Sequence, residues 1–159
     1  MSTILAVAQR GEAILNLTAA EVAKSELNSE WLNQLAVAMH ATMTERNGVG
    51  IAAPQVYVSK RVIIVASRPN LRYPDAPEMD KVVMVNPEIL EKSEATVLGE
   101  EGCLSVPDER GQVARAETIK VRYLTLQGEQ VETVYTGFPA RIVQHEVDHL
   151  DGILFIQRI

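Results

Sequence analysis

Long apolar runs are absent from this chain, and their absence bears on where the protein works. No window approaches the eighteen apolar residues that a membrane-spanning helix needs. Near the N-terminus a five-residue apolar stretch, Ile4 to Ala8, has no basic residue before it and is too short for the core of a signal peptide. We therefore expect a soluble, cytoplasmic protein that has no membrane partner.

Positive charge and cysteine are scarce as well. Fifteen Lys and Arg residues against 21 Asp and Glu residues give a formal net charge of −6, without a basic run. Binding to a phosphate backbone depends on clustered Lys and Arg, so direct nucleic-acid binding is not expected. The single cysteine, Cys103, excludes an internal disulfide. It is either a small buried hydrophobic residue or a reactive or ligating thiol, and the second suits a reducing compartment.

Aromatic residues make up only 4% of the chain, so aliphatic side chains must fill the core. With 159 residues, of which 47% are apolar, the chain has the size of one domain and can bury a core without disulfides or oligomerisation. We expect a single domain over residues 1–159 that is a monomer.

Two segments have the apolar spacing of amphipathic helices. The first covers residues 28–46, where Asn28 or Ser29 can accept a hydrogen bond from a free N–H at the start. The second covers residues 137–152 and has Pro139 in its first turn, where a missing N–H costs no hydrogen bond.

Other segments have the features of strands. Residues 61–66 and 81–85 are β-branched runs bounded by turn formers, and a surface loop with three prolines separates them. Residues 119–125 alternate as in a half-buried strand, and the turn at 127–129 leads into a second run at 131–135. Strands and hairpin-type turns between two helices predict an α+β fold with antiparallel β-sheets.

The second predicted helix carries His145-Glu146-Val147-Asp148-His149. Two histidines four residues apart project from one face of a helix and can bind the same metal ion, while Glu146 can reach a water molecule beside it. We therefore expect the sheets to surround a central metal-binding helix. The other histidine, His40, has no motif around it and is expected at the surface or the edge of the core.

A third ligand is needed, because two imidazoles leave a tetrahedral site short of donors. Only ten residues follow His149, none of them His or Glu, and Asp151 is badly placed for the same ion. The third ligand must then lie upstream, and the Cys103 thiolate is the best candidate. Its surroundings, residues 100–107, predict an extended, locally irregular stretch rather than a regular core strand.

A dense group of small residues stands at Gly48–Gln55. Such a segment allows another backbone or a ligand to approach closely. It lacks the Lys-Ser/Thr of a phosphate loop. A plain helix-to-strand turn is the alternative, and the polar Gln55 is the feature that favours a functional role.

Three segments together resemble the signature stretches of the peptide deformylase family, which can be written GΦGΦAAPQ, EGCLS and QHExDHLxG (Φ, apolar). They stand here as Gly48–Gln55, Glu101–Ser105 and Gln144–Gly152, in the family's order and at its usual separations. All 22 positions agree, and the resemblance in length and element order extends across nearly the whole chain.

The resemblance implies a metal-dependent hydrolase that removes the formyl group from the N-terminal formyl-methionine of nascent polypeptides and releases formate. It implies that Cys103, His145 and His149 ligate one divalent metal ion. Fe²⁺ is the expected native metal, and Zn²⁺, Ni²⁺ or Co²⁺ can substitute for it. A soft thiolate ligand favours iron and exposes the site to oxidation.

The resemblance also assigns the catalytic groups. Glu146 is the expected general acid and base, and the Gln55 side chain and the Leu104 backbone N–H are expected to stabilise the oxyanion. Glu101 is expected to pair with a nearby cation, and Asp148 to orient a helix or a neighbouring arginine.

The expected substrates are N-formylmethionyl peptides of nascent chains, met in the vicinity of the ribosome. Val49, Phe138 and Ile142 are expected to line a pocket for the methionine side chain. The backbone of Gly50 and the side chain of Arg110 are expected to hold the peptide extended, as an added strand. Alternatively, Arg110 is a charged residue on a solvated loop without a role in binding, and the two readings have equal weight.

Two other functions compete with this reading. A zinc endopeptidase uses the same pair of histidines, but it needs a long open cleft and usually a downstream third ligand. A binding module without turnover would be marked by replacement of Glu146 or Gln55, and both residues are present.

Overall fold

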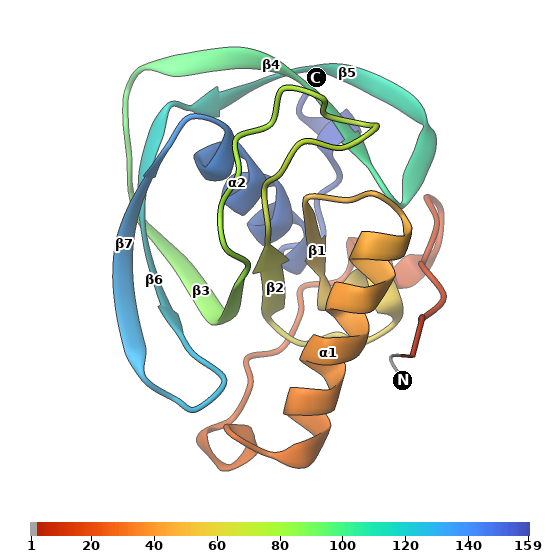
Figure 1. Cartoon of the computed structure of the whole chain (residues 1–159), viewed down its shortest axis with the longest axis vertical. Coiled ribbons are helices and arrows are strands. Elements are labelled where there is room, and N and C mark those ends of the chain that lie inside the picture. Colours follow the sequence, from red (N-terminus) through yellow and green to blue (C-terminus); the bar gives the residue numbers. More distant parts are fainter. Residues whose placement is uncertain (1–2) are drawn as a thin grey trace.

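The computed structural model describes residues 3–159, and within them it has two α-helices and seven strands (Figure 1). The helices are α1 (Glu30–Glu45) and α2 (Phe138–Leu150). The strands are β1 (Gly50–Ala52), β2 (Val62–Val65), β3 (Val82–Lys92), β4 (Thr96–Cys103), β5 (Val106–Ala116), β6 (Thr118–Leu124) and β7 (Gln130–Thr136).

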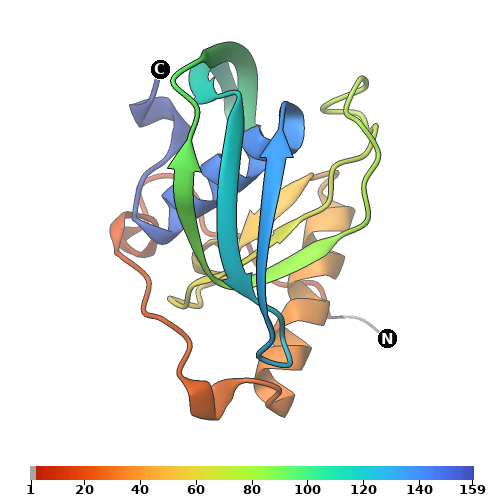
Figure 2. The same cartoon turned by 90° about the vertical axis from the view of Figure 1, so that its left-hand side faces the viewer.

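The strands form two antiparallel sheets. One sheet has five strands in the order β1-β2-β3-β6-β7, and the other is the hairpin of β4 and β5. Figure 2 shows β3, β6 and β7 side by side as a curved layer with α2 behind it. The predicted α+β class with antiparallel sheets is therefore confirmed.

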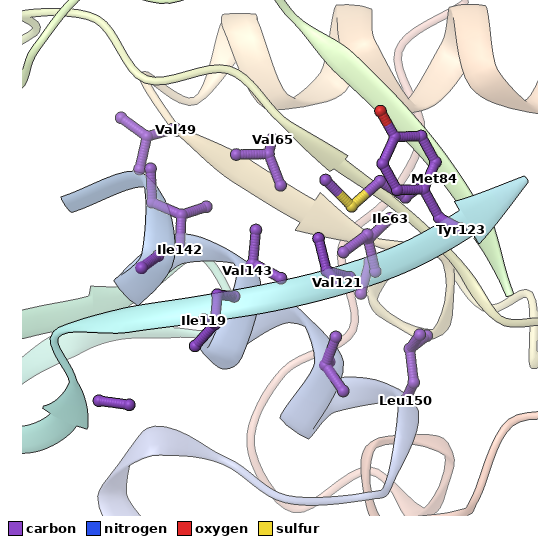
Figure 3. Close-up of a cluster of buried hydrophobic side chains, with 14 of the residues drawn as sticks. Val49, Ile63, Val65, Met84, Ile119, Val121, Tyr123, Ile142, Val143 and Leu150 are labelled. Carbon is purple, nitrogen blue, oxygen red and sulfur yellow. The ribbon is translucent and has the colours of Figure 1, made fainter. Parts of the chain in front are cut away.

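Helix α2 lies in the middle of the molecule, between the five-stranded sheet and the β4–β5 hairpin, which passes over it (Figure 1). One side of α2 packs on aliphatic side chains of the sheet, and Figure 3 shows this contact. Burying each such side chain stabilises the fold by roughly 1.5–3 kcal/mol, so the helix is firmly held. The cluster includes Ile63, Val65, Met84, Ile119, Val121, Ile142, Val143 and Leu150.

Both predicted helices begin as their sequences indicate. The Ser29 hydroxyl accepts a hydrogen bond from the Leu32 N–H at 3.3 Å, which caps α1. Gly137 precedes α2 with φ of 73°, a left-handed conformation that glycine adopts without strain, and Pro139 follows in the first turn. Within residues 3–159 neither helix is long and apolar enough to cross a membrane.

Two segments contain strands that no sequence pattern indicates. Residues 48–55 are not a plain turn, because they contain strand β1 and the start of the short 3-10 helix η3 (Ala53–Val56). Cys103 ends strand β4, and the pairing register shifts between Gly102 and Cys103, so the predicted extended, locally irregular stretch is confirmed, although it belongs to a paired strand. Both strands lack the alternating pattern that identifies a strand: β1 is buried throughout, and β4 passes from an exposed start to a fully buried end.

Candidate metal centre and adjoining cleft

Three side chains with metal-binding donors meet where the end of β4 reaches α2. Cys103 comes from β4, and His145 and His149 project from the same face of α2. Their donor atoms all lie within 4.8 Å of one another, and Cys103 Sγ is 3.3 Å from His149 Nε2. All three side chains are buried. The structure thus brings together the three predicted ligands, although they are as much as 46 residues apart in sequence.

This donor set fits a divalent transition metal. Nitrogen and sulfur donors bind zinc at about 2.0–2.3 Å, so tetrahedral neighbours lie roughly 3.3–3.8 Å apart. The distance of 3.3 Å between Cys103 Sγ and His149 Nε2 has this spacing. Burial alone would raise the pKa of the Cys103 thiol, but His149 and His145 hold that pKa well below its ordinary value. The sulfur is therefore in the thiolate form that ligates metals. No second group of this kind lies within residues 3–159.

Glu101 fixes the ring of His145. Its Oε1 atom is 2.9 Å from His145 Nδ1, which leaves Nε2 to face Cys103 and His149. Arg115 donates two hydrogen bonds to the same carboxylate, both at 2.9 Å, and Arg141 donates a third at 2.6 Å. Burial opposes ionisation of Glu101, yet the hydrogen bonds from Arg115 and His145 hold its pKa well below the ordinary value. A carboxylate that orients the ring of a ligating histidine is a common feature of metal sites.

The charge network continues away from the cleft. Arg115 also donates to Asp148 at 2.6 Å, and Arg158 donates to the other oxygen of Asp148 at 2.9 Å. Asp148 therefore holds two arginines against α2, one buried and one at the surface. A buried ion pair of this kind is costly to break, because the remaining charge is left without a partner.

Glu146 reaches into the cleft between these ligands and β1. It is buried, and its Oε1 atom has no hydrogen-bond partner among residues 3–159. Burial raises the pKa of Glu146 to about 7. A Cβ placed on Gly50 would lie 2.6 Å from Glu146 Oε2, so only glycine leaves room for this carboxylate. A buried carboxyl that titrates near neutrality, with one oxygen free, can accept and return a proton.

Gln55 is held with its amide group toward the thiolate. Its Oε1 atom accepts a hydrogen bond from the Ala52 N–H at 2.9 Å, so its Nε2 atom points inward. Nε2 donates to Ser105 Oγ at 3.1 Å and lies 3.5 Å from Cys103 Sγ. Leu104, the residue after Cys103, lines the same cleft. A fixed amide donor at this place can stabilise negative charge that develops in the cleft.

Four of the five residues that were predicted to contact the substrate line the cleft. Val49, Gly50, Phe138 and Ile142 line it, together with Glu146 and Gln55. Arg110 lies instead in an adjoining groove, where its guanidinium stacks 4.8 Å from the centre of the Tyr73 ring. Arg110 lies on strand β5 and not on a loop, but it is exposed, so both readings of its role stay predictions.

Some residues of the site carry no sequence signal. Arg72 and Tyr73 come from the proline-containing loop between β2 and β3 and line both the cleft and the groove. Arg141 is a buried arginine on α2 whose partners lie on β4 and β5. No motif or periodicity marks any of the three, because their roles depend on contacts with distant segments.

His40 and Asp151, which were not expected to bind the metal ion, lie outside the cluster of donors. His40 is on α1 and lines a separate surface recess with Lys81. Asp151 pairs with Arg61 at 2.9 Å.

The sequence profile of the polypeptide deformylase family matches residues 4–159. The chain is 51% identical over 154 residues to peptide deformylase 2 of Shewanella oneidensis, covering 97% of the chain and 83% of that relative. It is 48% identical over 156 residues to peptide deformylase 2 of a Nostoc species, covering 98% of the chain and 86% of that relative.

Solved structures agree with these sequence relatives. The Met-Ala-Ser-bound class I type b peptide deformylase of Acinetobacter baumannii is 79% identical and superposes with a TM-score of 0.98, with all of both chains covered. The peptide deformylase of Thermotoga maritima is 37% identical with a TM-score of 0.86, covering 98% of this chain and 97% of that one.

Proposed function

The chain belongs to the peptide deformylase family, and from this premise we propose that it is a metal-dependent hydrolase that removes the formyl group from the N-terminal formyl-methionine of nascent polypeptides and releases formate. The observation that carries the proposal is the cluster of Cys103, His145 and His149 beside the free carboxylate oxygen of Glu146. Residues 1–159 act as one catalytic domain. The protein works as a monomer in the cytoplasm, near the ribosome.

Cys103, His145 and His149 hold one divalent ion, natively Fe²⁺, which Zn²⁺, Ni²⁺ or Co²⁺ can replace. The thiolate state of Cys103 and the orientation of His145 by Glu101 support this assignment. When bound, such an ion supplies a Lewis acid that polarises the formyl group and acidifies a water molecule.

Glu146 moves the protons of the reaction. It takes a proton from the attacking water and delivers it to the nitrogen of methionine as the bond between that nitrogen and the formyl carbon breaks. The products are formate and a free amino terminus. The pKa of about 7 and the unpartnered Oε1 atom support this role, because a group that titrates near the working pH serves both as base and as acid.

Gln55 and the backbone N–H of Leu104 stabilise the negative charge on the formyl oxygen. The hydrogen bond from Ala52 supports the assignment, since it keeps the Gln55 oxygen away from the cleft and the NH₂ group toward it. A single donor of this kind contributes about 3–4 kcal/mol to the stability of a transition state.

The peptide lies along β1 with its methionine among Val49, Phe138 and Ile142. Strand β1 is an edge of the five-stranded sheet, so an extended peptide can add to its free side and hydrogen-bond to Gly50. The A. baumannii relative described as bound to Met-Ala-Ser supports a methionine-first peptide in this cleft.

The experiment that tests the function compares two substrates with the anaerobically purified protein. Formyl-Met-Ala-Ser should release formate at a rate that the metal content limits. An internally quenched peptide without a formyl group should stay intact. Internal cleavage without formate release would show an endopeptidase instead, and tight peptide binding without either product would show a binding module.

A further inference from the structure

We propose that Arg141 is a positioning residue of the metal centre: from helix α2 it holds strand β4 in the place where Cys103 meets the two histidines. The proposal rests on the proposed function and adds to the metal site a residue that does not touch the metal. Arg141 lies about one turn before His145 on α2, and it is 7% exposed.

The three proposed ligands come from two separate elements. His145 and His149 are fixed relative to each other because one helix carries both. Cys103 comes from β4, so its distance from the histidines depends on how β4 lies against α2. Ligand distances in metal sites vary by only about 0.2 Å. Some contact must therefore fix the strand closely against the helix.

Apolar packing does not fix the first part of β4. Val97 and Leu98 are 47% and 69% exposed, and along this strand the buried residues begin only at Glu101. Side chains that stay in solvent contribute little hydrophobic stabilisation. Among residues 3–159 the only partner strand of β4 is β5, so no wider sheet holds it either. Polar contacts must therefore hold β4 against α2.

Arg141 supplies these polar contacts. Its Nη2 atom donates to the Val97 carbonyl at 2.7 Å, and its Nη1 atom lies 3.4 Å from the Gly99 carbonyl. Nη1 also donates to the Val113 carbonyl on β5 at 2.9 Å. Within residues 3–159 the hydrogen bonds of Arg141 alone join α2 to the backbone of β4. A guanidinium is a rigid fork of donors, so it sets both the distance and the orientation of the strand.

The contact between Arg141 and Glu101 is shared with another arginine. Arg141 donates to Glu101 Oε2 at 2.6 Å, while Arg115 donates to both oxygens of Glu101 at 2.9 Å. Glu101 therefore keeps two hydrogen bonds from Arg115, and its contact with His145, when Arg141 is replaced. The contacts that Arg141 alone makes are those with the strand backbone. Its effect on the metal site therefore passes through Cys103.

Gly99 leaves the space that the guanidinium occupies. A Cβ placed on Gly99 would lie 2.7 Å from Arg141 Cζ and 2.8 Å from Arg141 Nη2. Gly99 is not among the residues with positive φ, so its backbone does not require glycine. A methyl group at this position therefore displaces the head of Arg141 without removing a charge or a donor.

The test loads the wild type and the variants with Co²⁺ and measures both the affinity and the absorption spectrum. Cys103 is the single cysteine, so the thiolate-to-cobalt charge-transfer band reports on the bond between Cys103 and the metal alone. We expect Arg141→Met to weaken Co²⁺ binding about 10- to 100-fold, the usual effect of replacing a residue that supports a metal ligand. At saturating Co²⁺ its charge-transfer band should also be weaker than that of the wild type.

Gly99→Ala tests the same contact with Arg141 still present. It should weaken Co²⁺ binding about tenfold, the lower end of that range, and reduce the band as well. Gly111→Ala is the matched control, because it adds the same methyl group to β5, where the Cβ would meet only the flexible end of Ile159. Arg122→Met is the control for loss of an arginine, since Arg122 pairs with Glu88 at the surface. Both controls should keep the wild-type affinity and band.

Three results would overturn this inference alone. Wild-type Co²⁺ affinity in Arg141→Met would show that β4 keeps its place without the arginine. Weaker binding with an unchanged band at saturation would show an effect through Glu101 and His145 instead of Cys103. Equal changes in Gly99→Ala and Gly111→Ala would show that the hairpin responds to any added methyl group.

Two further outcomes are decided by the same measurements. If circular dichroism shows that Arg141→Met is unfolded, Gly99→Ala decides the inference, because it keeps every charged residue of the network. A wild-type protein that binds no Co²⁺ would refute the metal site of the proposed function and this inference with it.

Discussion

The floor and the mouth of the cleft are built in different ways. The floor, formed by Cys103, His145, His149, Glu101 and Arg115, comes from regular elements and is almost closed to solvent. The mouth, formed by Arg72, Tyr73 and Arg110, depends on a proline-containing loop and is half-exposed. The floor is a network of buried ion pairs, while the ion pair of the mouth, between Arg110 and Glu100, is partly exposed to solvent.

This difference separates reactivity from selection. Charges in a buried network interact strongly, so a change in the floor should alter metal binding, turnover or stability by several kcal/mol. Charges near the surface are screened by solvent, so a change in the mouth should alter substrate choice by less than a factor of about ten. The following predictions test this separation, beginning with the largest effect.

Replacement of Glu146 by Gln should abolish most turnover and leave the metal in place. The amide has the shape of the carboxyl group but cannot carry the proton, and general acid–base catalysis contributes up to about 10⁴-fold. We expect kcat for formate release to fall about 10³- to 10⁴-fold with unchanged metal content. A variant with a near-normal rate would refute the proton-transfer role.

Replacement of Arg115 by Met should lower the free energy of unfolding by about 3–5 kcal/mol, because Glu101 and Asp148 lose a buried partner. Urea denaturation measures the effect. Arg122→Met is the control, since Arg122 pairs with Glu88 at the surface and should cost less than about 1 kcal/mol. Equal losses in the two variants would contradict the distinction between buried and exposed pairs.

Replacement of Gly50 by Ala should reduce kcat/KM by about 10²-fold, the usual cost of displacing a catalytic group by about 1 Å. The new Cβ would lie 2.6 Å from Glu146 Oε2 and 2.7 Å from Ile142 Cγ2. Gly111→Ala is the control, because its Cβ would meet only the flexible end of Ile159. Similar kinetics for Gly50→Ala and the wild type would show that Glu146 tolerates displacement.

The stability of the metal-free protein should depend on pH in a defined direction. The pKa of Glu101 is lower in the folded state than its ordinary value of 4.5, so its contribution is fully present above about pH 4.5 and is lost as the pH falls toward the folded pKa. Unfolding measured from pH 7 down to pH 3 should show this decline. The decline should be shallower in Arg115→Met, and an equal slope would contradict the assigned cause.

Much of the floor could be predicted from the sequence, because its residues lie in local patterns. The spacing of His145 and His149 requires only that the segment is helical, and the apolar periodicity of α2 indicates that it is. The cap at Ser29 and the hairpin of β6 and β7 are local features too, and both are confirmed. The metal-binding and catalytic roles stay predictions, although the structure brings their side chains together.

The parts that could not be predicted depend on contacts between distant segments. Strand β4 is exposed at its start and buried at Cys103, so no alternation identifies it. Arg141 has its partners 28 to 44 residues away, on β4 and β5. Arg72 and Tyr73 gain their place from the hydrogen bond between Tyr73 and Gly102, which no sequence pattern indicates.

The central claim is that Cys103, His145 and His149 bind one metal ion together. Elemental analysis of anaerobically purified protein tests it most directly, in the wild type and in the Ala variant of each of the three residues. His40→Ala serves as the control, because His40 lies on α1 outside the cluster. We predict about one divalent ion per chain in the wild type and in His40→Ala, and a large loss in the other three. Full metal content in Cys103→Ala, or a wild-type chain that takes up no divalent ion, would contradict the account.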